Sequence, residues 1–157
     1  MRVRRWHELL KIIEENNVRS FVEIGVLKGE TASNILGAFP DLEYIGIDPY
    51  VGSLDTYDHA VNKKLAQDIF DQYKNATLFI GVSEDFAVEK QYDLVFIDGD
   101  HSYQGAKADI EFWRDKCKIL SGHDYSPHHE GVVKAVDENF NKVKVLKDNV
   151  WLTQITY

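Results

Sequence analysis

The sequence predicts an α/β fold with a seven-stranded, mostly parallel sheet, helices on both of its faces and an antiparallel hairpin at the C-terminus. From residue 20 to residue 140, short apolar runs alternate with amphipathic stretches, a pattern typical of βαβ units and parallel sheets. After residue 140, two strand-like runs follow each other with no helix between them, which predicts the hairpin. A chain of 157 residues is about the size of one domain, so we expect a single domain over residues 1–157.

The expected helices and strands can be assigned one by one along the chain. An amphipathic helix over 6–16 carries Leu9, Ile12 and Ile13 on one side, so the segment 1–19 is expected to cover the sheet. Five parallel strands are expected over 20–25, 42–48, 76–81, 92–98 and 117–125. Further helices are expected over 31–38, 58–74, 104–113 and 130–140, and the hairpin strands over 142–148 and 150–157, around a turn at Asp148 and Asn149.

Charge and cysteine content restrict the partners and the compartment. The chain has 26 acidic and 18 basic residues, a net charge of −8, which disfavours nucleic-acid and anionic membrane partners because both need a basic surface. No apolar run approaches the roughly 20 residues of a membrane span. Cys117 is the single cysteine, so no intrachain disulfide can form and a reducing compartment is allowed. We therefore expect a cytoplasmic protein with neither a nucleic-acid nor a membrane partner.

Open parallel sheets bind ligands at the carboxyl ends of their strands, so the residues that follow each strand are the candidates for function. The first strand is followed by Glu23, Gly25 and Gly29, and a helix begins directly afterwards. Gly25 permits a sharp turn, Gly29 permits close approach of a ligand or of the helix, and the free amides of the helix start add donors. The spacing differs from G-x-G-x-x-G and from the phosphate-binding loop, and the acidic Glu23 suits a cationic ligand. A purely structural strand–helix turn stays an equal alternative.

The second and third strands end in polar residues that fit a nucleoside. Asp48 ends the second strand, 23 residues beyond Gly25, and a carboxylate there can accept hydrogen bonds from both hydroxyls of a ribose. Ser83 and Glu84 lie in the turn after the third strand, where they can contact an adenine. The alternatives are a cap or turn role for Asp48 and a simple turn with an N-cap at Ser83.

The fourth and fifth strands end in carboxylates and imidazoles. Asp98 and His101 follow the fourth strand, and His123 and Asp124 follow the fifth. Neighbouring strands place Asp98 and Asp124 about 5 Å apart laterally, which suits an oxygen-ligand site for Mg²⁺. His101 can act as a metal ligand or as a general base near neutral pH. A cap-and-turn role is the alternative for the residues after the fourth strand, and no spacing resembles a structural zinc site.

Five short motifs, in order, carry a family resemblance. They are E-x-G-x-x-x-G from Glu23, the acid Asp48, I-D-G-x-H-x-Y from Ile97, G-H-D-Y from Gly122 and G-V-x-x-A-V from Gly131. With them the chain resembles class I S-adenosylmethionine (SAM)-dependent methyltransferases, most closely the methyltransferase-24 family. The resemblance implies a Rossmann-like class I methyltransferase fold with SAM as cofactor. The implied cofactor-binding residues are Glu23, Gly25, Gly29, Asp48, Ser83, Glu84 and Asp98.

The resemblance extends to metal-dependent O-methyltransferases of the catechol and caffeoyl-CoA kind. Their two metal aspartates fall on Asp98 and Asp124, and their third ligand, an asparagine, falls on Tyr125, a poor ligand that His123 or His101 can replace. Their catalytic lysine falls near His101. The implied activity is O-methylation of a small molecule or a sugar, assisted by Mg²⁺ or another divalent metal. The metal ligands would be Asp98, Asp124 and His123, and the catalytic residues His101 and Asp98.

Two other functions stay open on the sequence. One is a catalytically inactive module that binds SAM or S-adenosylhomocysteine (SAH) beside a catalytic partner. The other, a nucleotide-dependent oxidoreductase, is disfavoured by the missing G-x-G-x-x-G. Only the segment 1–19 and the loop over 50–60 are available as a lid, so we expect an open acceptor site that suits a glycan, or a site completed by a second subunit of a homo-oligomer. His128 and His129 are expected either in an exposed loop or facing the substrate.

Overall fold

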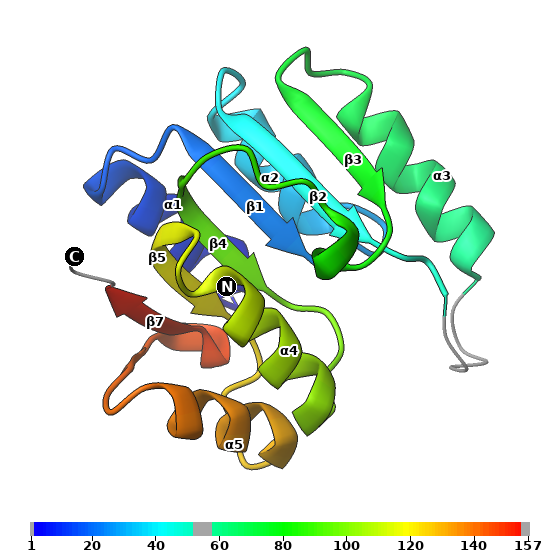
Figure 1. Cartoon of the computed structure of the whole chain (residues 1–157). Coiled ribbons are helices and arrows are strands. Elements are labelled where there is room, and N and C mark those ends of the chain that lie inside the picture. The colour runs from blue at the N-terminus through cyan, green and yellow to red at the C-terminus, as the bar shows by residue number, and fades with distance from the viewer. Residues whose placement is uncertain (1, 52–57, 155–157) are drawn as a thin grey trace.

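The computed structural model describes residues 2–51 and 58–154, which are built around one seven-stranded sheet (Figure 1). The strands are β1 (Ser20–Ile24), β2 (Glu43–Asp48), β3 (Ala76–Ile80), β4 (Tyr92–Ile97), β5 (Cys117–Gly122), β6 (Lys144–Val145) and β7 (Trp151–Gln154). Their order in the sheet is β3-β2-β1-β4-β5-β7-β6. The strands β1 to β5 pair in parallel, β7 pairs antiparallel with β5, and β6 pairs antiparallel with β7. The predicted parallel sheet and its terminal hairpin are confirmed.

Helices cover both faces of this sheet, as predicted. They are α1 (Arg5–Glu15), α2 (Glu30–Ala38), α3 (His59–Phe70), α4 (Tyr103–Trp113) and α5 (Glu130–Asn139), with the 3-10 turns η1 (Ser83–Asp85) and η2 (Lys147–Asn149). In Figure 1, α4 and α5 lie in front of the sheet, and α1, α2 and α3 lie on its other face. Among the described residues, none of the helices combines the length and the apolar character needed to cross a bilayer. The centre of the loop expected over 50–60, residues 52–57, lies outside the described ranges.

Alternate residues of each strand supply the two halves of the core. In β1, Phe21 packs with the core under α1, α2 and α3, whereas Val22 packs with the core under α4 and α5. This follows from the two-residue period of a strand, which directs successive side chains to opposite faces. The apolar side predicted for α1 is confirmed, because Leu9, Ile12 and Ile13 are buried in the first of these cores.

Three elements end well before their predicted boundaries. The hairpin strand expected over 142–148 is limited to β6, because Lys147–Asn149 form η2, in which Asp148 has a φ of 56°. The helix expected over 58–74 ends at Phe70, and a turn follows in which the amide of Tyr73 donates to the carbonyl of Phe70 (3.0 Å). The strand expected over 117–125 ends at Gly122, because Asp124 has a φ of 61° that a strand cannot continue.

The strand order creates one switch point at the carboxyl ends of the strands. β1 and β4 are neighbours in the sheet although they are not consecutive in the chain, and the order reverses between them. Ligands of open α/β sheets bind at such a switch point. Leu27, Tyr50 and Asp124, which follow β1, β2 and β5, all have positive φ values, between 50° and 61°. Backbone conformations of this kind cluster at functional sites, so they direct attention to this edge of the sheet.

Candidate active site

The loop between β1 and α2 is shaped by two glycines. Gly25 (φ 86°) and Gly29 (φ 83°) adopt the left-handed conformation that favours glycine. A Cβ on Gly25 would lie 2.2 Å from the backbone oxygen of Asp98, so a larger residue would displace the loop that follows β4. The glycine loop and the loop after β4 therefore pack directly against each other at the switch point.

Asp48, at the end of β2, holds the glycine loop through its side chain. Its Oδ2 accepts the amides of Val26 (3.0 Å) and Leu27 (2.9 Å), and its Oδ1 accepts the amide of Tyr50 (2.8 Å). An ionised carboxylate offers about four lone-pair sites, so about one remains for a ligand. Asp48 thus shapes the loop through three hydrogen bonds, which leave about one lone pair for a further donor.

The side chain of Glu23 is buried beneath the site and is not an exposed anion. Its side chain is 1% exposed, and its Oε2 accepts a hydrogen bond from the hydroxyl of Tyr44 (2.8 Å). Burial raises the pKa of Glu23 from 4.5 to about 8, so the carboxyl is mostly neutral at pH 7. This differs from the expectation that its negative charge suits a cationic ligand.

The turn after β3 presents only one of its two predicted polar side chains. Ser83 is buried, and its hydroxyl donates to Asp109 Oδ1 (2.6 Å) and accepts from Trp113 Nε1 (3.0 Å). Its side chain is therefore bonded within the protein. Glu84, the first residue after it in η1, is exposed.

Asp98, directly after β4, lies between a guanidinium and two imidazoles. Its Oδ2 is 3.0 Å from Arg5 Nε, which α1 brings across the edge of the sheet. Its Oδ1 is 3.6 Å from both His101 Nε2 and His123 Nδ1. Because the side chain of Asp98 is only 9% exposed, its charge needs these partners.

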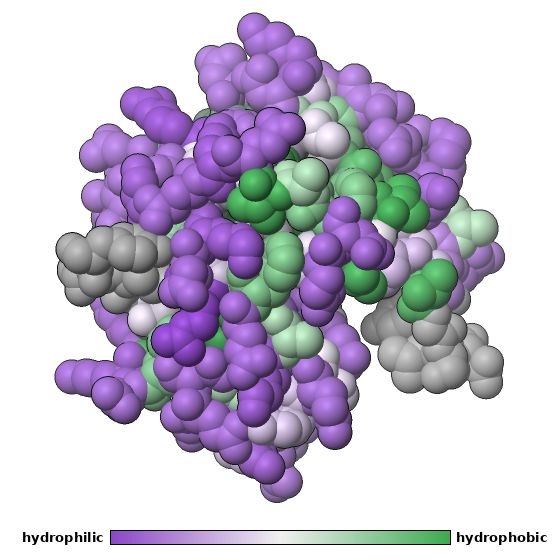
Figure 2. Space-filling view, viewed as in Figure 1, coloured by the Kyte–Doolittle hydropathy of each residue, from purple (hydrophilic) through white to green (hydrophobic). Residues whose placement is uncertain are grey.

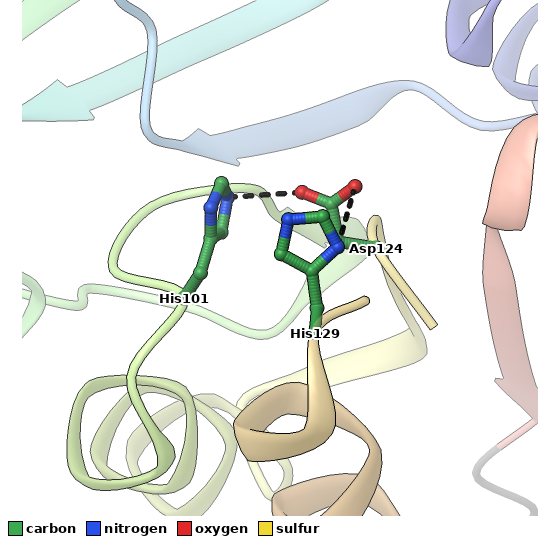
Figure 3. Close-up of side chains that lie close together, drawn as sticks. All are labelled: His101, Asp124 and His129. Atoms are coloured by element: carbon green, nitrogen blue, oxygen red, sulfur yellow. Dashed lines mark ion pairs between the residues drawn. The ribbon is translucent and has the colours of Figure 1, made fainter. Parts of the chain in front are cut away.

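The carboxylate of Asp124, after β5, is in contact with three histidines. Its Oδ2 is 3.1 Å from His101 Nε2, and its Oδ1 is 3.0 Å from His123 Nδ1 and 3.6 Å from His129 Nδ1. Figure 3 shows His101 and His129 approaching the carboxylate from separate segments, the loop before α4 and the start of α5. The rings of His101 and His129 meet edge to face, with centroids 5.2 Å apart.

The charges of this cluster shift one another's pKa values. Contact with Asp98 raises the pKa of His101, and the nearer charge of Asp124 adds to it, whereas burial opposes the shift. Burial favours the neutral ring of His123, but the hydrogen bond to Asp124 and the charge of Asp98 raise its pKa overall. Burial also works against ionised Asp124, yet the three imidazoles lower its pKa. The cluster therefore favours an ionised Asp124 beside the cationic rings of His101 and His123.

The same side chains have the geometry to hold a divalent cation. One ligand atom each from Asp98, His123 and Asp124 lie within 4.8 Å of one another, and so do those from His101, Asp124 and His129. The first set is the one that the sequence predicted, and the structure brings its members together. Carboxylate oxygen with imidazole nitrogen is a donor set that suits divalent metals.

Two residues of the site were missed by the sequence reasoning. His129 was not separated from its neighbour His128, although it contacts Asp124. Arg5 was not singled out either, although it lies four residues before Leu9 and so on the buried side of α1, where a charged residue is unusual. Tyr125, at the position of the third metal ligand in related enzymes, donates its hydroxyl to Asp137 (2.7 Å).

This strand order, with a glycine loop after β1 and acids after β2 and β4, defines a class I methyltransferase fold. A scan for known families matches residues 22–125 to Methyltransf_24, a methyltransferase domain, and the chain belongs to this family. The domain is accordingly a SAM-dependent methyltransferase. A comparison with curated proteins gives no significant match. The findings support neither the inactive module nor the oxidoreductase.

Solved structures share the fold at low sequence identity. The O-methyltransferase TomG from Streptomyces achromogenes, in complex with SAM, has a TM-score of 0.70 and 14% identity over 98% of this chain and 80% of its own. An O-methyltransferase from Bacillus cereus, in complex with SAH, has a TM-score of 0.64 and 13% identity over 96% and 80%. CalS11, a TDP-rhamnose 3′-O-methyltransferase of calicheamicin biosynthesis, has a TM-score of 0.67 and 15% identity over 96% and 81%.

Proposed function

We propose that this methyltransferase transfers the methyl group of SAM to a hydroxyl oxygen of a small molecule or a sugar, with a divalent cation held by Asp98, Asp124 and His123. The observation that carries the proposal is the cluster of two carboxylates and three imidazoles next to the glycine loop. Such a concentration of ionisable groups, with mutually shifted pKa values, is typical of a catalytic centre.

The ends of β2 and β3 fit the nucleoside part of SAM. Val51, Ile80 and Val82 expose apolar side chains there, and an adenine ring can cover them. Figure 2 shows hydrophobic surface in this part of the molecule, beside the grey segment at the right of the view, on a face that is otherwise mostly hydrophilic. The remaining lone pair of Asp48 would accept one ribose hydroxyl.

The donor set of the metal site fits the proposed role. Two carboxylates supply the oxygen ligands that Mg²⁺ and Mn²⁺ prefer, and the imidazole of His123 favours a transition metal such as Mn²⁺. A divalent cation bound there would lower the pKa of a coordinated acceptor hydroxyl. The two carboxylate oxygens of Asp98 have different partners: Oδ1 lies near the imidazoles, and Oδ2 lies near Arg5.

His101 is the proposed general base. The acceptor oxygen bonds to the methyl carbon, the electrons of the broken C–S bond stay on sulfur, and the hydroxyl proton passes to the imidazole of His101. The charges of Asp98 and Asp124 stabilise the imidazolium that forms. Because the same charges raise the pKa of His101, the neutral ring becomes the major form only at a higher pH, and activity should rise with pH through that pKa.

A sugar or small-molecule acceptor is supported by the likeness to O-methyltransferases, among them one for TDP-rhamnose. His101 is 45% exposed and Asp124 is 13% exposed, so the cluster is reachable from solvent. An open site of this kind suits a large acceptor, or a second subunit that completes it.

The test is a calorimetric titration with SAH, with and without Mn²⁺ or Mg²⁺, followed by methyl transfer from SAM to a catechol and to a nucleotide sugar. We expect one-to-one SAH binding and turnover that EDTA abolishes and Mn²⁺ restores. Turnover that is insensitive to EDTA would remove the metal from the proposal. SAH binding without turnover on any hydroxylated acceptor would remove oxygen as the methylated atom.

A further inference from the structure

We propose that Arg5 binds the carboxylate at the amino-acid end of the cofactor, which makes α1 part of the cofactor site and not only a cover for the sheet. The inference rests on the SAM-dependent function stated above. It concerns a residue outside the motif-bearing segment, which begins at the first strand.

The guanidinium of Arg5 is fixed in place by one of its nitrogens. Its Nε donates to Thr31 Oγ1 (3.1 Å) and lies 3.0 Å from Asp98 Oδ2. Its two terminal nitrogens donate to no residue within the described ranges. A guanidinium carries five N–H donors in a planar fork that matches a carboxylate, so the two terminal nitrogens of Arg5 can bind one. The side chain is 26% exposed, which leaves them accessible.

The partners of Arg5 place this fork at the glycine loop. Thr31 lies in the first turn of α2, two residues after Gly29, and no side chain caps the amino end of this helix. Asp98 lies against Gly25 on the other side of the loop. A carboxylate beside Arg5 would therefore also meet the positive end of the α2 dipole.

The charges match those of a zwitterion. Arg5 and Asp98 put a positive and a negative group 3.0 Å apart, and the amino-acid end of SAM carries a carboxylate and an ammonium on one carbon. The carboxylate would take the free donors of Arg5, and the ammonium would take Asp98 Oδ2. Glu23, buried nearby with a pKa of about 8, does not compete as an anion at neutral pH.

The experiment compares two ligands on one pair of proteins. SAH carries the carboxylate, whereas S-adenosyl-3-thiopropylamine keeps the nucleoside, the thioether and the ammonium but lacks it. We expect Arg5→Gln to weaken SAH binding by about 10- to 100-fold and to change binding of the amine by no more than about twofold. Arg2→Gln, an exposed arginine just before α1, is the matched control and should change neither.

An equal loss for both ligands, or no loss for either, overturns the inference, because Arg5 would then only anchor α1. If the wild-type protein binds neither ligand, the SAM-dependent function itself fails, which is a separate outcome. Since Arg5→Gln also removes a partner of Asp98, thermal unfolding is measured alongside. Thr31→Val removes one partner of the guanidinium but keeps its charge. It should weaken binding of SAH but not of the amine, and by a smaller factor than Arg5→Gln.

Discussion

At the carboxyl ends of the strands, the acids on the β1–β2 side and those on the β4–β5 side have different bonding partners. On the β1–β2 side, Glu23 and Asp48 are bonded to neutral donors, namely a tyrosine hydroxyl and three backbone amides. On the β4–β5 side, Asp98 and Asp124 lie against imidazoles and a guanidinium. In the first half Asp48 therefore shapes a loop and Glu23 is buried as a neutral carboxyl, whereas in the second half the imidazoles beside Asp124 keep this carboxylate ionised.

The pKa values follow the same division. Burial raises the pKa of Glu23 to about 8, so that this carboxyl is neutral at pH 7. The imidazoles lower the pKa of Asp124 in spite of its own burial. Two acids near the same edge of the sheet thus differ in charge because of what packs against them. The difference teaches that a place at the ligand-binding edge of the sheet does not fix the charge of an acidic residue.

The largest effect is expected from Asp124→Asn. Asparagine tolerates the φ of 61° at this position, so the loop should keep its course while the negative charge is lost. We expect turnover to fall by at least about 100-fold, with Mn²⁺ binding lost and SAH affinity within about threefold of the wild type. Rates under saturating SAM and calorimetry with Mn²⁺ measure this. Asp115→Asn, at an exposed acid, is the control. Full activity of Asp124→Asn would mean that the two halves do not differ in the proposed way.

Asp48→Ala should weaken cofactor binding and the fold together. The amides of Val26, Leu27 and Tyr50 lose their common acceptor, and the cost of the substitution is about 3 kcal/mol of the free energy of unfolding. SAH affinity should fall about tenfold, because the loop loses its support. Urea unfolding and calorimetry on Asp48→Ala and on Asp41→Ala, an exposed acid before β2, separate the two effects. Unchanged SAH affinity would remove Asp48 from the cofactor site.

Glu23→Gln should change how stability depends on pH. The pKa of Glu23 rises from 4.5 to about 8 on folding, so between these values the folded state holds a proton that the unfolded chain releases. The free energy of unfolding then falls as pH rises, by up to about 1.4 kcal/mol per pH unit. Glutamine removes this contribution. Urea unfolding at pH 6 and pH 7 should show a flatter dependence for Glu23→Gln than for the wild type or for Glu14→Gln, an exposed control. Parallel slopes would contradict the burial of a proton at Glu23.

The fold was predictable because each element has its own local signal. The parallel strands are buried and read as apolar runs, and the helices between them are amphipathic, so alternation alone predicted the layers. The hairpin followed from two strands in succession. The end of β5 was not predicted, because aspartate is only enriched at positive φ and its residue type alone does not predict such a conformation at Asp124.

The site was predictable where its residues follow strands directly, and was missed where they come from elsewhere. Neighbouring parallel strands end at the same edge of the sheet, and this brings together Asp98, His123 and Asp124. Arg5 reaches that edge only through the packing of α1, a contact between segments 93 residues apart, which a local pattern does not encode. Ser83 is occupied by Asp109 and Trp113, and the sequence gives no sign of that pairing.

The smallest effect is expected from His129→Gln, which tests how far the charged half extends. His129 Nδ1 is 3.6 Å from Asp124 Oδ1, farther than His101 or His123, and its charge helps to lower the pKa of Asp124. Without it the pKa of Asp124 should rise, and the proposed base His101 loses a neighbouring positive charge, so the acid limb of the pH–rate profile, which His101 sets, should move to higher pH. Near neutral pH, kcat/KM should fall by only about threefold. His128→Gln, at the exposed neighbouring position, should leave the profile in place. A loss as large as that of Asp124→Asn would instead make His129 a direct ligand or base, and the set formed by His101, Asp124 and His129 would become the metal site.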